Sequence, residues 1–358
     1  MKAVRYYGKQ DVRVEEVDEP ELVDGSVKIA PAFNGLCGSD LSLFYSGPIP
    51  PAPSTDEPHP ISGETLPVIF GHEFSGVVTD VADDVDHVSV GDRVVIEPLM
   101  VDGTCWACQQ GRYNLCEQMG FIGISGRGGG LSQSIVVEQR WVHPIGDMSL
   151  EEGALIEPLA VALNAVNRAG VVSGETAVVG GGGPIGQLVA AALKAKGLNV
   201  ILSEVSAARQ QIARDAGYAD RIVDPAQESL VDVVHEATDG IGAAFAFDCA
   251  GVEVVFHQMF DVVRPTGHVE IVAVYADTVD FDVAQALTMQ ERTIGSSIGY
   301  ANVHAEAIDL VQSGKLNVRQ FISSIIEMDD VVDQGLRKLR EAGETEVKIL
   351  VKIDQEMG

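Results

Sequence analysis

Short stretches of alternating apolar and polar residues fill the first hundred positions of the chain. Val27–Ala30, Gly76–Val78 and Arg93–Ile96 are such stretches, and Gly, Pro and Asp residues interrupt them. Alternation with a period of two between turn-forming residues is typical of β-strands that bury one face. The region from Val4 to about Val101 is therefore predicted to be β-rich and barrel-like.

The pattern changes near Gly153. Ala154–Ala169 carries apolar residues at helical spacing, and from Ala177 onward strand-like apolar runs alternate with helical segments. This alternation predicts a doubly wound parallel sheet with helices on both faces. The predicted strands are Ala177–Val179, Val200–Ser203, Arg221–Val223, Ala244–Asp248 and His268–Val274, and the predicted helices include Ile185–Lys196 and Ala207–Ala216.

The end of the chain is predicted to return to the β-rich half. After about Gly295 the sequence shows a helical segment, His304–Gln312, and a last apolar strand, Val347–Ile353. We therefore predict an α/β protein of two domains, a discontinuous one formed by residues 1–160 and 297–358 and a second one formed by residues 161–296.

The net charge of the 358-residue chain is −29, from 53 acidic against 24 basic residues spread along its length. Such a surface repels nucleic acid and anionic lipid, so neither is expected as a partner. We predict adaptation to a salty cytoplasm, as in a halophile, where ions screen the repulsion; the alternative is an ordinary acidic surface that favours solubility. No run approaches the roughly 18 apolar residues of a membrane helix, and a strand pattern rather than a signal peptide begins the chain, so a soluble, cytoplasmic protein is expected.

Three of the five cysteines lie close together, in the pattern Asp102-x2-Cys105-x2-Cys108-x7-Cys116. An odd number of clustered cysteines favours metal binding over a disulfide framework. Four such ligands can surround one structural zinc ion. The alternative is three free thiols in a loop, because the carboxylate in the first position holds zinc less tightly than a thiolate does.

A glycine-rich turn follows the predicted strand Ala177–Val179 and precedes a helix. Glycines there permit a tight turn and let the backbone approach a pyrophosphate at the helix N-terminus. Glu204 ends the next strand, where a carboxylate bonds the ribose hydroxyls and repels a 2′-phosphate, so NAD is favoured over NADP. Arg209 nearby keeps NADP as one alternative. The second alternative is a glycine turn that binds no ligand. The predicted cofactor-binding residues are Gly181, Gly183, Pro184, Ile185, Gly186, Glu204 and Arg209.

Three further segments carry metal-ligand chemistry: Cys37–Asp40, Gly71–Glu73 and Glu157–Pro158. Each alone has an ordinary interpretation, since an isolated cysteine is often simply buried and an isolated histidine is more often structural. Together they supply a thiolate, an imidazole and carboxylates, which suits a catalytic zinc with one replaceable water. Their spacing alone does not join them.

These segments, with Gly35–Leu41, Gly71–Gly76, Gly91–Val94, Ile156–Ala160 and Gly181–Gly186, resemble the zinc-dependent medium-chain alcohol dehydrogenases, in the branch of sorbitol, threonine and butanediol dehydrogenases. The likeness runs in order along essentially the whole chain. Glu57–Pro60, Tyr113–Cys116 and Gly120–Gly123 are most similar to the (R,R)-butanediol dehydrogenases. The resemblance implies that residues 1–160 and 297–358 form a GroES-like catalytic domain, that residues 161–296 form a Rossmann NAD-binding domain, and that the active site lies in the cleft between them.

The resemblance also implies roles for single residues. Asp40 would orient the histidine ligand of the metal, and Ser39 would take the substrate proton. Asp102 stands where many relatives have a cysteine, so that site would be Asp/Cys3 or lost, and Ser42 replaces a histidine that ends the proton relay in many relatives. The implied ligands of the catalytic zinc are Cys37, His72, Glu73 and Glu157, the last directly or through water.

The implied reaction is zinc-dependent, NAD-linked oxidation of a small secondary alcohol or vicinal diol, foremost 2,3-butanediol to acetoin. Phe121, Ile122 and the proline-rich loop 47–67 would form an apolar pocket that suits such a substrate. Sorbitol or another polyol, L-threonine and glucose are alternative substrates, and a noncatalytic nucleotide-binding relative is a more distant possibility. The family implies a homodimer or homotetramer, in which an apolar strand near Tyr275–Val283 or Ile294–Ile298 would pair between subunits.

Overall fold

The structure is a computed structural model in which residues 1–353 are described. The backbone separates into two compact units. The first comprises Met1–Glu157, His304–Gln312 and the chain from Ile322 on; the second comprises Pro158–Val303 and Ser313–Phe321. These boundaries differ from the predicted 297–358, because residues around Gly299 and Asn317 bond into the second unit: Asn164 donates to Gly299 O at 3.0 Å, and Asn317 N donates to the Tyr218 hydroxyl at 2.6 Å.

The first unit is built around strand β3 (Ser26–Gly35), which pairs with three other strands. Its main sheet has the order β10-β6-β5-β3-β18-β17, with β9 also on β3. Alternating burial along β3 explains its period-two pattern, since one face packs inward. The strands paired in this sheet are β5 (Glu73–Val81), β6 (Arg93–Ile96), β9 (Ile135–Glu138), β10 (Val142–Pro144), β17 (Ile322–Glu327) and β18 (Lys348–Lys352).

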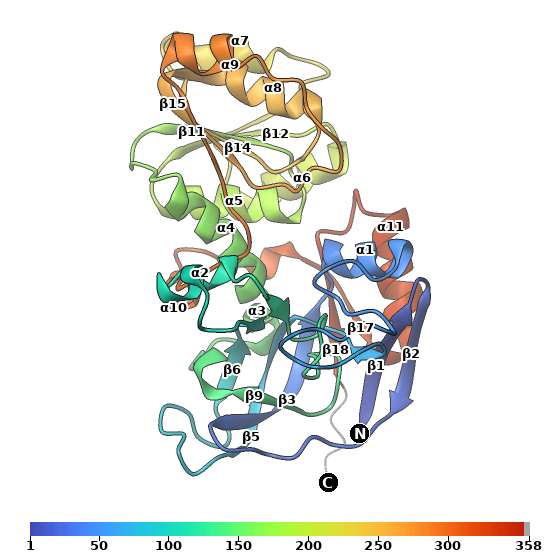
Figure 1. Ribbon diagram of the computed structural model, residues 1–358. Helices are drawn as coiled ribbons and strands as arrows, with labels where there is room; N and C mark the ends of the chain where they lie inside the picture. Colours follow the sequence, from blue (N-terminus) through green and yellow to red (C-terminus); the bar gives the residue numbers. More distant parts are fainter. Residues whose placement is uncertain (354–358) are drawn as a thin grey trace. The chain divides into compact units, whose positions relative to one another are not determined.

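Smaller elements complete the first unit (Figure 1). A three-stranded sheet has the order β2-β1-β4, and β7 pairs with β8. The bounds are β1 (Lys2–Gly8), β2 (Asp11–Glu16), β4 (Val68–Ile69), β7 (Leu99–Met100), β8 (Gly120–Phe121), α1 (Gly38–Ser46), α2 (Trp106–Gln109), α3 (Leu150–Gly153), α10 (His304–Gln312), a π-helical turn (Val331–Arg337) and α11 (Lys338–Glu341). The predicted helix His304–Gln312 is confirmed.

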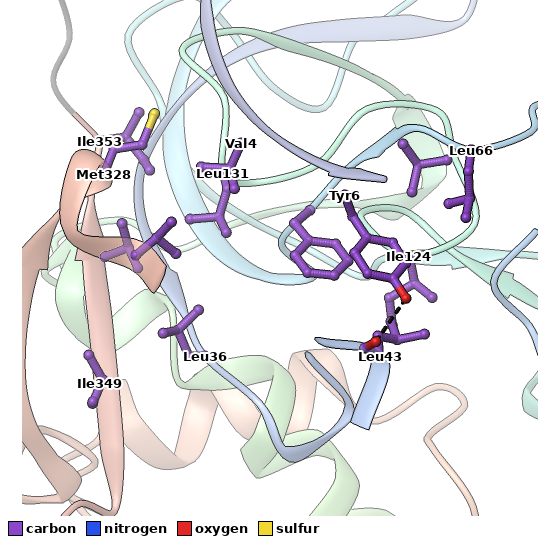
Figure 2. Close-up of a cluster of buried hydrophobic side chains, with 14 residues drawn as sticks. Val4, Tyr6, Leu36, Leu43, Leu66, Ile124, Leu131, Met328, Ile349 and Ile353 are labelled. Carbon is purple, nitrogen blue, oxygen red and sulfur yellow. Dashed lines mark hydrogen bonds between the residues drawn. The ribbon is translucent and has the colours of Figure 1, made fainter. Parts of the chain in front are cut away.

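A hydrophobic core joins distant parts of the first unit. Figure 2 shows buried side chains from the first strands, from the loop before β9 and from the C-terminal strand in one cluster. Tyr6 stacks on Phe70 with ring centroids 4.6 Å apart, and its hydroxyl donates to Leu43 O at 2.8 Å. Because both partners are buried, this bond fixes the strand against helix α1.

The second unit is a parallel six-stranded sheet of order β13-β12-β11-β14-β15-β16. In chain order within this unit that is 3-2-1-4-5-6, the arrangement of dinucleotide-binding folds. Figure 1 shows α4 and α5 on one face of the sheet and α7 and α8 on the other. The bounds are α4 (Ile156–Arg168), β11 (Thr176–Gly180), α5 (Pro184–Ala195), β12 (Asn199–Ser203), α6 (Ala207–Ala216), β13 (Arg221–Val223), α7 (Leu230–Ala237), β14 (Ala243–Asp248), α8 (Glu253–Val262), β15 (Val263–Ile271), α9 (Val283–Ala286) and β16 (Thr293–Ser296).

The prediction of a β-rich half followed by a parallel α/β half is confirmed. Two local expectations were wrong. β15 runs from Val263 to Ile271, whereas the predicted strand was His268–Val274. Tyr275–Val283 forms no strand, because Tyr275 donates a hydrogen bond to Asp248 and Phe281 packs on Phe256. Within residues 1–353, none of the helices combines the length and the apolar character that a membrane crossing requires.

Replacing Tyr6 by Phe should lower the free energy of unfolding of the first unit by about 1 kcal/mol, because the buried Leu43 O would lose the Tyr6 hydroxyl as a donor and keep the Gly47 N–H. Urea unfolding followed by tryptophan fluorescence tests this, since Trp106 and Trp141 both lie in the first unit. Tyr45→Phe is the matched control and should change the free energy by less than about 0.5 kcal/mol. Equal effects of the two variants would show that the Tyr6 bond adds no stability.

Candidate functional site

Strand pairing brings Cys37 and His72 together although they lie far apart in the sequence. Cys37 follows the end of β3, His72 directly precedes β5, and the antiparallel register places Gly35 opposite Glu73. The ligand atoms of Cys37, His72 and Glu73 all lie within 4.8 Å of one another. Two of the predicted segments are thus joined by backbone hydrogen bonds alone.

A close backbone contact holds His72 in place. Gly71 has a φ of 103°, a left-handed conformation that suits glycine, and a side chain at Gly123 would meet Gly71 O at 1.9 Å. Glycine at both positions lets loop 120–130 press against the residue before His72. This contact fixes the backbone from which the imidazole of His72 projects.

Asp40 sets the orientation of the imidazole of His72. The Asp40 carboxylate lies 3.4 Å from Nδ1 of His72 and accepts the Cys37 N–H at 2.9 Å, and Asp40 is fully buried. Burial lowers the pKa of His72, but the charge of Asp40, together with hydrogen bonds to Asp40 and Cys37, outweighs it and raises the pKa well above its ordinary value. The arrangement leaves Nε2 for the side of Cys37 and Ser39, as in carboxylate–histidine–metal groups.

Ser39 lies beside the same nitrogen, and Ser42 does not. Ser39 Oγ is 3.2 Å from Nε2 of His72. Ser42 is exposed, and its hydroxyl donates to Gly38 O at 3.1 Å within helix α1. Ser39 is therefore placed for proton exchange at this site, whereas Ser42 bonds its own helix.

Lys348 is a site residue that the sequence did not reveal. Its ammonium, on β18, donates to both carboxylate oxygens of Glu73, at 2.8 and 2.5 Å, and to Leu36 O at 3.2 Å. Burial lowers the pKa of Lys348, but Glu73 and the Cys37 thiolate outweigh it and raise the pKa. Glu73 was predicted as a zinc ligand; here both of its oxygens bond an ammonium. The only sequence signal was a pair of lysines, Lys348 and Lys352, in an otherwise apolar strand, and nothing along the chain marks Lys348 as the buried one.

Glu157 lies in the first turn of α4 and is 7% exposed. Its charge acts on Lys348, but Glu157 is not in the group of ligand atoms that lie within 4.8 Å of one another. Its role as a metal ligand stays a prediction. The thiol of Cys37 and the oriented imidazole of His72, with carboxylates nearby, do fit a zinc ion, because zinc prefers sulfur and nitrogen donors supported by hydrogen-bonded neighbours.

The predicted pocket residues take different positions. The Phe121 ring lies edge-on to His72, with centroids 6.3 Å apart, whereas Ile122 is 3% exposed and packs inward. Loop 47–67 is held to loop 120–130, since Ser62 donates to Ser125 O at 2.6 Å and Ser125 donates to Pro51 O at 3.0 Å. The two loops are therefore ordered together next to His72.

The cysteine loop, residues 102–116, brings all four predicted ligands within 4.8 Å of one another. Backbone N–H groups of Cys108 and Glu117 donate to Cys105 and lower its pKa, whereas burial raises the pKa of Cys108 to about 12. Three thiolates cannot stay charged side by side without a cation. The donor set and the amide bonds to sulfur fit a zinc ion.

Asp102 has a second task in the cysteine loop. Its Oδ1 accepts the N–H groups of Thr104 at 2.6 Å and Cys105 at 2.8 Å, and these bonds lower its pKa to about 2. Asp102 is therefore ionised at every physiological pH. It shapes the turn and supplies negative charge to the metal position.

The glycine-rich turn has the geometry of a pyrophosphate-binding loop. Gly181 has a φ of 95°, and a side chain at Gly186 would meet Gly181 O at 1.9 Å, so both positions require glycine. Gly183 caps α5, Pro184 is its first residue, and open space surrounds the position of a Gly183 side chain. The helix N-terminus is thus left accessible to an anion.

Glu204 connects this turn to the next strand. Its Oε2 accepts the Gly182 N–H and its Oε1 accepts the Ser206 N–H, both at 2.7 Å, and it is 5% exposed. Arg209 lies 3.9 Å from Oε2. The predicted ribose carboxylate is therefore held rigidly beside the turn, with its charge partly balanced by Arg209.

Comparisons with known proteins agree with this geometry. Residues 23–147 match the alcohol dehydrogenase GroES-like domain, and residues 184–313 match the zinc-binding dehydrogenase family. The chain is 44% identical over 352 residues to (R,R)-butanediol dehydrogenase of Neisseria gonorrhoeae, covering 98% of this chain and 99% of the relative. It is 39% identical over 355 residues to the Bacillus subtilis protein of that name, with 98% and 99% covered. The crystal structure of 2R,3R-butanediol dehydrogenase from Bacillus subtilis matches with a TM-score of 0.92 at 38% identity over 99% of both chains.

Zinc affinity of the cysteine loop should rise with pH between 6 and 8, because binding releases the thiol protons that Cys108 holds tightly. Asp102→Asn should weaken zinc binding by about tenfold or more at every pH. It should not change how steeply the zinc affinity rises with pH, since Asp102 has no proton to release. Competition with a chromophoric chelator in a Cys37→Ser background measures this. Unchanged affinity in Asp102→Asn would mean that Asp102 only shapes the turn.

Lys348→Met should destabilise the metal-free protein by about 3–5 kcal/mol, because the buried Glu73 carboxylate loses the only lysine or arginine that pairs with it among residues 1–353. Lys352→Met, on the same strand but about half exposed, is the control and should have little effect. Urea unfolding with and without added zinc measures both. If Glu73 can bind the metal, zinc should recover part of the loss in Lys348→Met; no recovery would argue against Glu73 as a ligand.

Proposed function

Since the chain belongs to the zinc-binding alcohol dehydrogenase family, we propose that it oxidises a small secondary alcohol or vicinal diol to the ketone, with (R,R)-2,3-butanediol and acetoin as the first candidate pair. The observation that carries the proposal is the convergence of Cys37, His72 and Ser39, with Asp40 behind the imidazole. Identity of 44% to a butanediol dehydrogenase over 98% of the chain supports the substrate.

Cys37 and His72 would hold the zinc ion, with Glu73 or Glu157 as a further ligand. The bound ion supplies Lewis-acid polarisation of the substrate oxygen. Asp40 keeps Nε2 of His72 available for this, and the Ser39 hydroxyl, which both donates and accepts, takes the substrate proton and passes its own onward. Ser42 is exposed and donates its own hydroxyl proton to Gly38 O, so the onward acceptor would be solvent.

The second unit would bind NAD. The N–H groups of the glycine-rich turn and the start of α5 would receive the pyrophosphate, and the nicotinamide supplies the hydride acceptor. Glu204 is held by Gly182 and Ser206, so its carboxylate would face the ribose with fixed geometry. NADP is less favourable because Glu204 would repel its phosphate and already occupies Arg209.

Other substrates fit the same chemistry less well. The Phe121 ring beside His72 presents an apolar surface, which suits butanediol better than the many hydroxyls of sorbitol or glucose. L-Threonine needs partners for an ammonium and a carboxylate. A noncatalytic nucleotide-binding protein would have no use for the thiol, imidazole and carboxylates that converge here.

We further propose a cytoplasmic homo-oligomer adapted to high salt. All five cysteines are free, as expected in a reducing compartment, and the net charge is −29. β16 ends the described sheet, and Ile294 and Ile298 nearby are 42% and 46% exposed, which supports pairing of this edge with a second copy. Light scattering at low and high KCl would report the assembly state and its dependence on salt.

The activity is tested by NADH formation from the stereoisomers of 2,3-butanediol, sorbitol, L-threonine and glucose over a range of KCl concentrations. We expect chelator-sensitive activity mainly on (R,R)-2,3-butanediol. Cys37→Ser should lose this activity, whereas Cys249→Ser, whose half-buried thiol lies in the second unit, should retain it. Activity mainly on another substrate would overturn the butanediol assignment, and full activity in Cys37→Ser would overturn the zinc site.

Glu204→Ala should raise the ratio of kcat/KM for NADP to that for NAD by about tenfold or more, equivalent to about 1.4 kcal/mol, because the charge that repels a 2′-phosphate is removed. Arg209→Ala should lower the same ratio, since the remaining cation is lost. Steady-state kinetics with both cofactors measure the two variants. A ratio that Glu204→Ala leaves unchanged would show that Glu204 only holds the turn.

A further inference from the structure

A second cluster of metal-ligand side chains lies in the first unit, outside the sites described above. Glu97 directly follows β6, His143 is on β10, and His304 is the first residue of α10. Their ligand atoms all lie within 4.8 Å of one another. The catalytic scheme uses none of them.

The distances converge on one carboxylate oxygen. Nε2 of His143 is 3.1 Å and Nδ1 of His304 is 3.4 Å from Oε2 of Glu97. Ligands placed about 2.0–2.2 Å from a tetrahedral zinc ion lie roughly 3.2–3.6 Å from one another. The two imidazoles stack nearly parallel, 11° apart, with centroids separated by 5.0 Å. Small ring rotations would therefore turn both nitrogens towards a shared ion.

The charge balance of this cluster calls for a cation. Glu97 is 3% exposed, and within residues 1–353 no lysine or arginine forms an ion pair with it. The buried carboxylate thus faces two imidazoles and a phenol, and a bound cation would supply the missing counter-ion.

We propose that Glu97, His143 and His304 form an additional metal site that binds Zn²⁺ or a chemically similar divalent transition-metal ion. Two imidazoles and one carboxylate are a zinc-type donor set. The Tyr113 hydroxyl donates to Oε1 of Glu97 at 2.7 Å and holds the carboxylate from behind, as supporting groups of metal ligands do.

Metal binding requires a proton to leave the nitrogen that becomes the ligand. Nε2 of His143 faces Oε2 of Glu97; when the ion takes the place between these two atoms, the proton of the imidazole is carried by Nδ1. The side chain of His143 is 26% exposed, which gives the ion a path and leaves room for a water as fourth ligand. No electron transfer is involved.

The bound ion would act as a structural clamp. Glu97 and His143 belong to the N-terminal part of the first unit, whereas His304 starts the helix with which the chain returns to this unit from the second. A metal ion bound by all three residues would hold the start of α10 against β6 and β10. The site is independent of the proposed dehydrogenase activity, because it contains no residue of the catalytic group.

The test is an anomalous diffraction experiment at the zinc absorption edge on crystals of the full-length protein grown with excess zinc chloride. We expect a peak bounded by Glu97, His143 and His304, in addition to peaks at the cysteine loop and at Cys37. His143→Gln should lose this peak and one zinc per chain by elemental analysis, and retain the others. His257→Gln, an exposed histidine on α8, should lose none.

Absence of a peak among the three residues in the wild-type crystals would overturn the proposal, and so would equal zinc content in the wild type and in folded His143→Gln. If His143→Gln does not fold, the wild-type anomalous map alone decides. Because neither readout is activity, the metal site and the dehydrogenase function can fail separately.

Discussion

The pairing of strand β3 with β5 and β18 is the constraint on which the proposed catalytic site depends. Gly35 lies opposite both Glu73 and Leu350 in the sheet. This single register places the end of β3 beside the start of β5, and it brings Lys348 onto Glu73. A slip by one residue would turn these side chains to the opposite face, so backbone hydrogen bonds decide whether the predicted ligands meet at all.

Two buried charged groups beside Cys37 are each matched by a neighbour of opposite sign. Glu73 is paired with Lys348, and His72 is placed against Asp40. These pairs hold the site in shape before any metal arrives, since an unpaired buried charge costs several kcal/mol. Glu97 departs from this rule among the described residues, because its neighbours are imidazoles and a phenol, and that contrast motivates the additional metal site.

In the second unit, the predicted cofactor-binding residues are brought together by neighbouring strands of one parallel sheet. Its strand order reverses between β11 and β14, and in open parallel sheets the ligand crevice lies at such a switch point. The glycine-rich turn follows β11 directly, and Glu204 follows β12, so adjacent strands deliver both. Glu204 also accepts the Gly182 N–H, so the side chain that we propose to select the cofactor also shapes the turn.

The sequence by itself determined what depends on neighbours along the chain. The alternating strands, the helix His304–Gln312, the turn Gly181–Gly186 and the cysteine loop follow from short-range periodicity, glycine conformation and ligand spacing. Tertiary structure decided the ion pair between Glu73 and Lys348, 275 residues apart, the meeting of Glu97 with His304, and the packing of residues 313–321 into the second unit. Such contacts arise from sheet register and from the return of the chain, and a lysine or histidine leaves no periodic trace in the sequence that would reveal its distant partner.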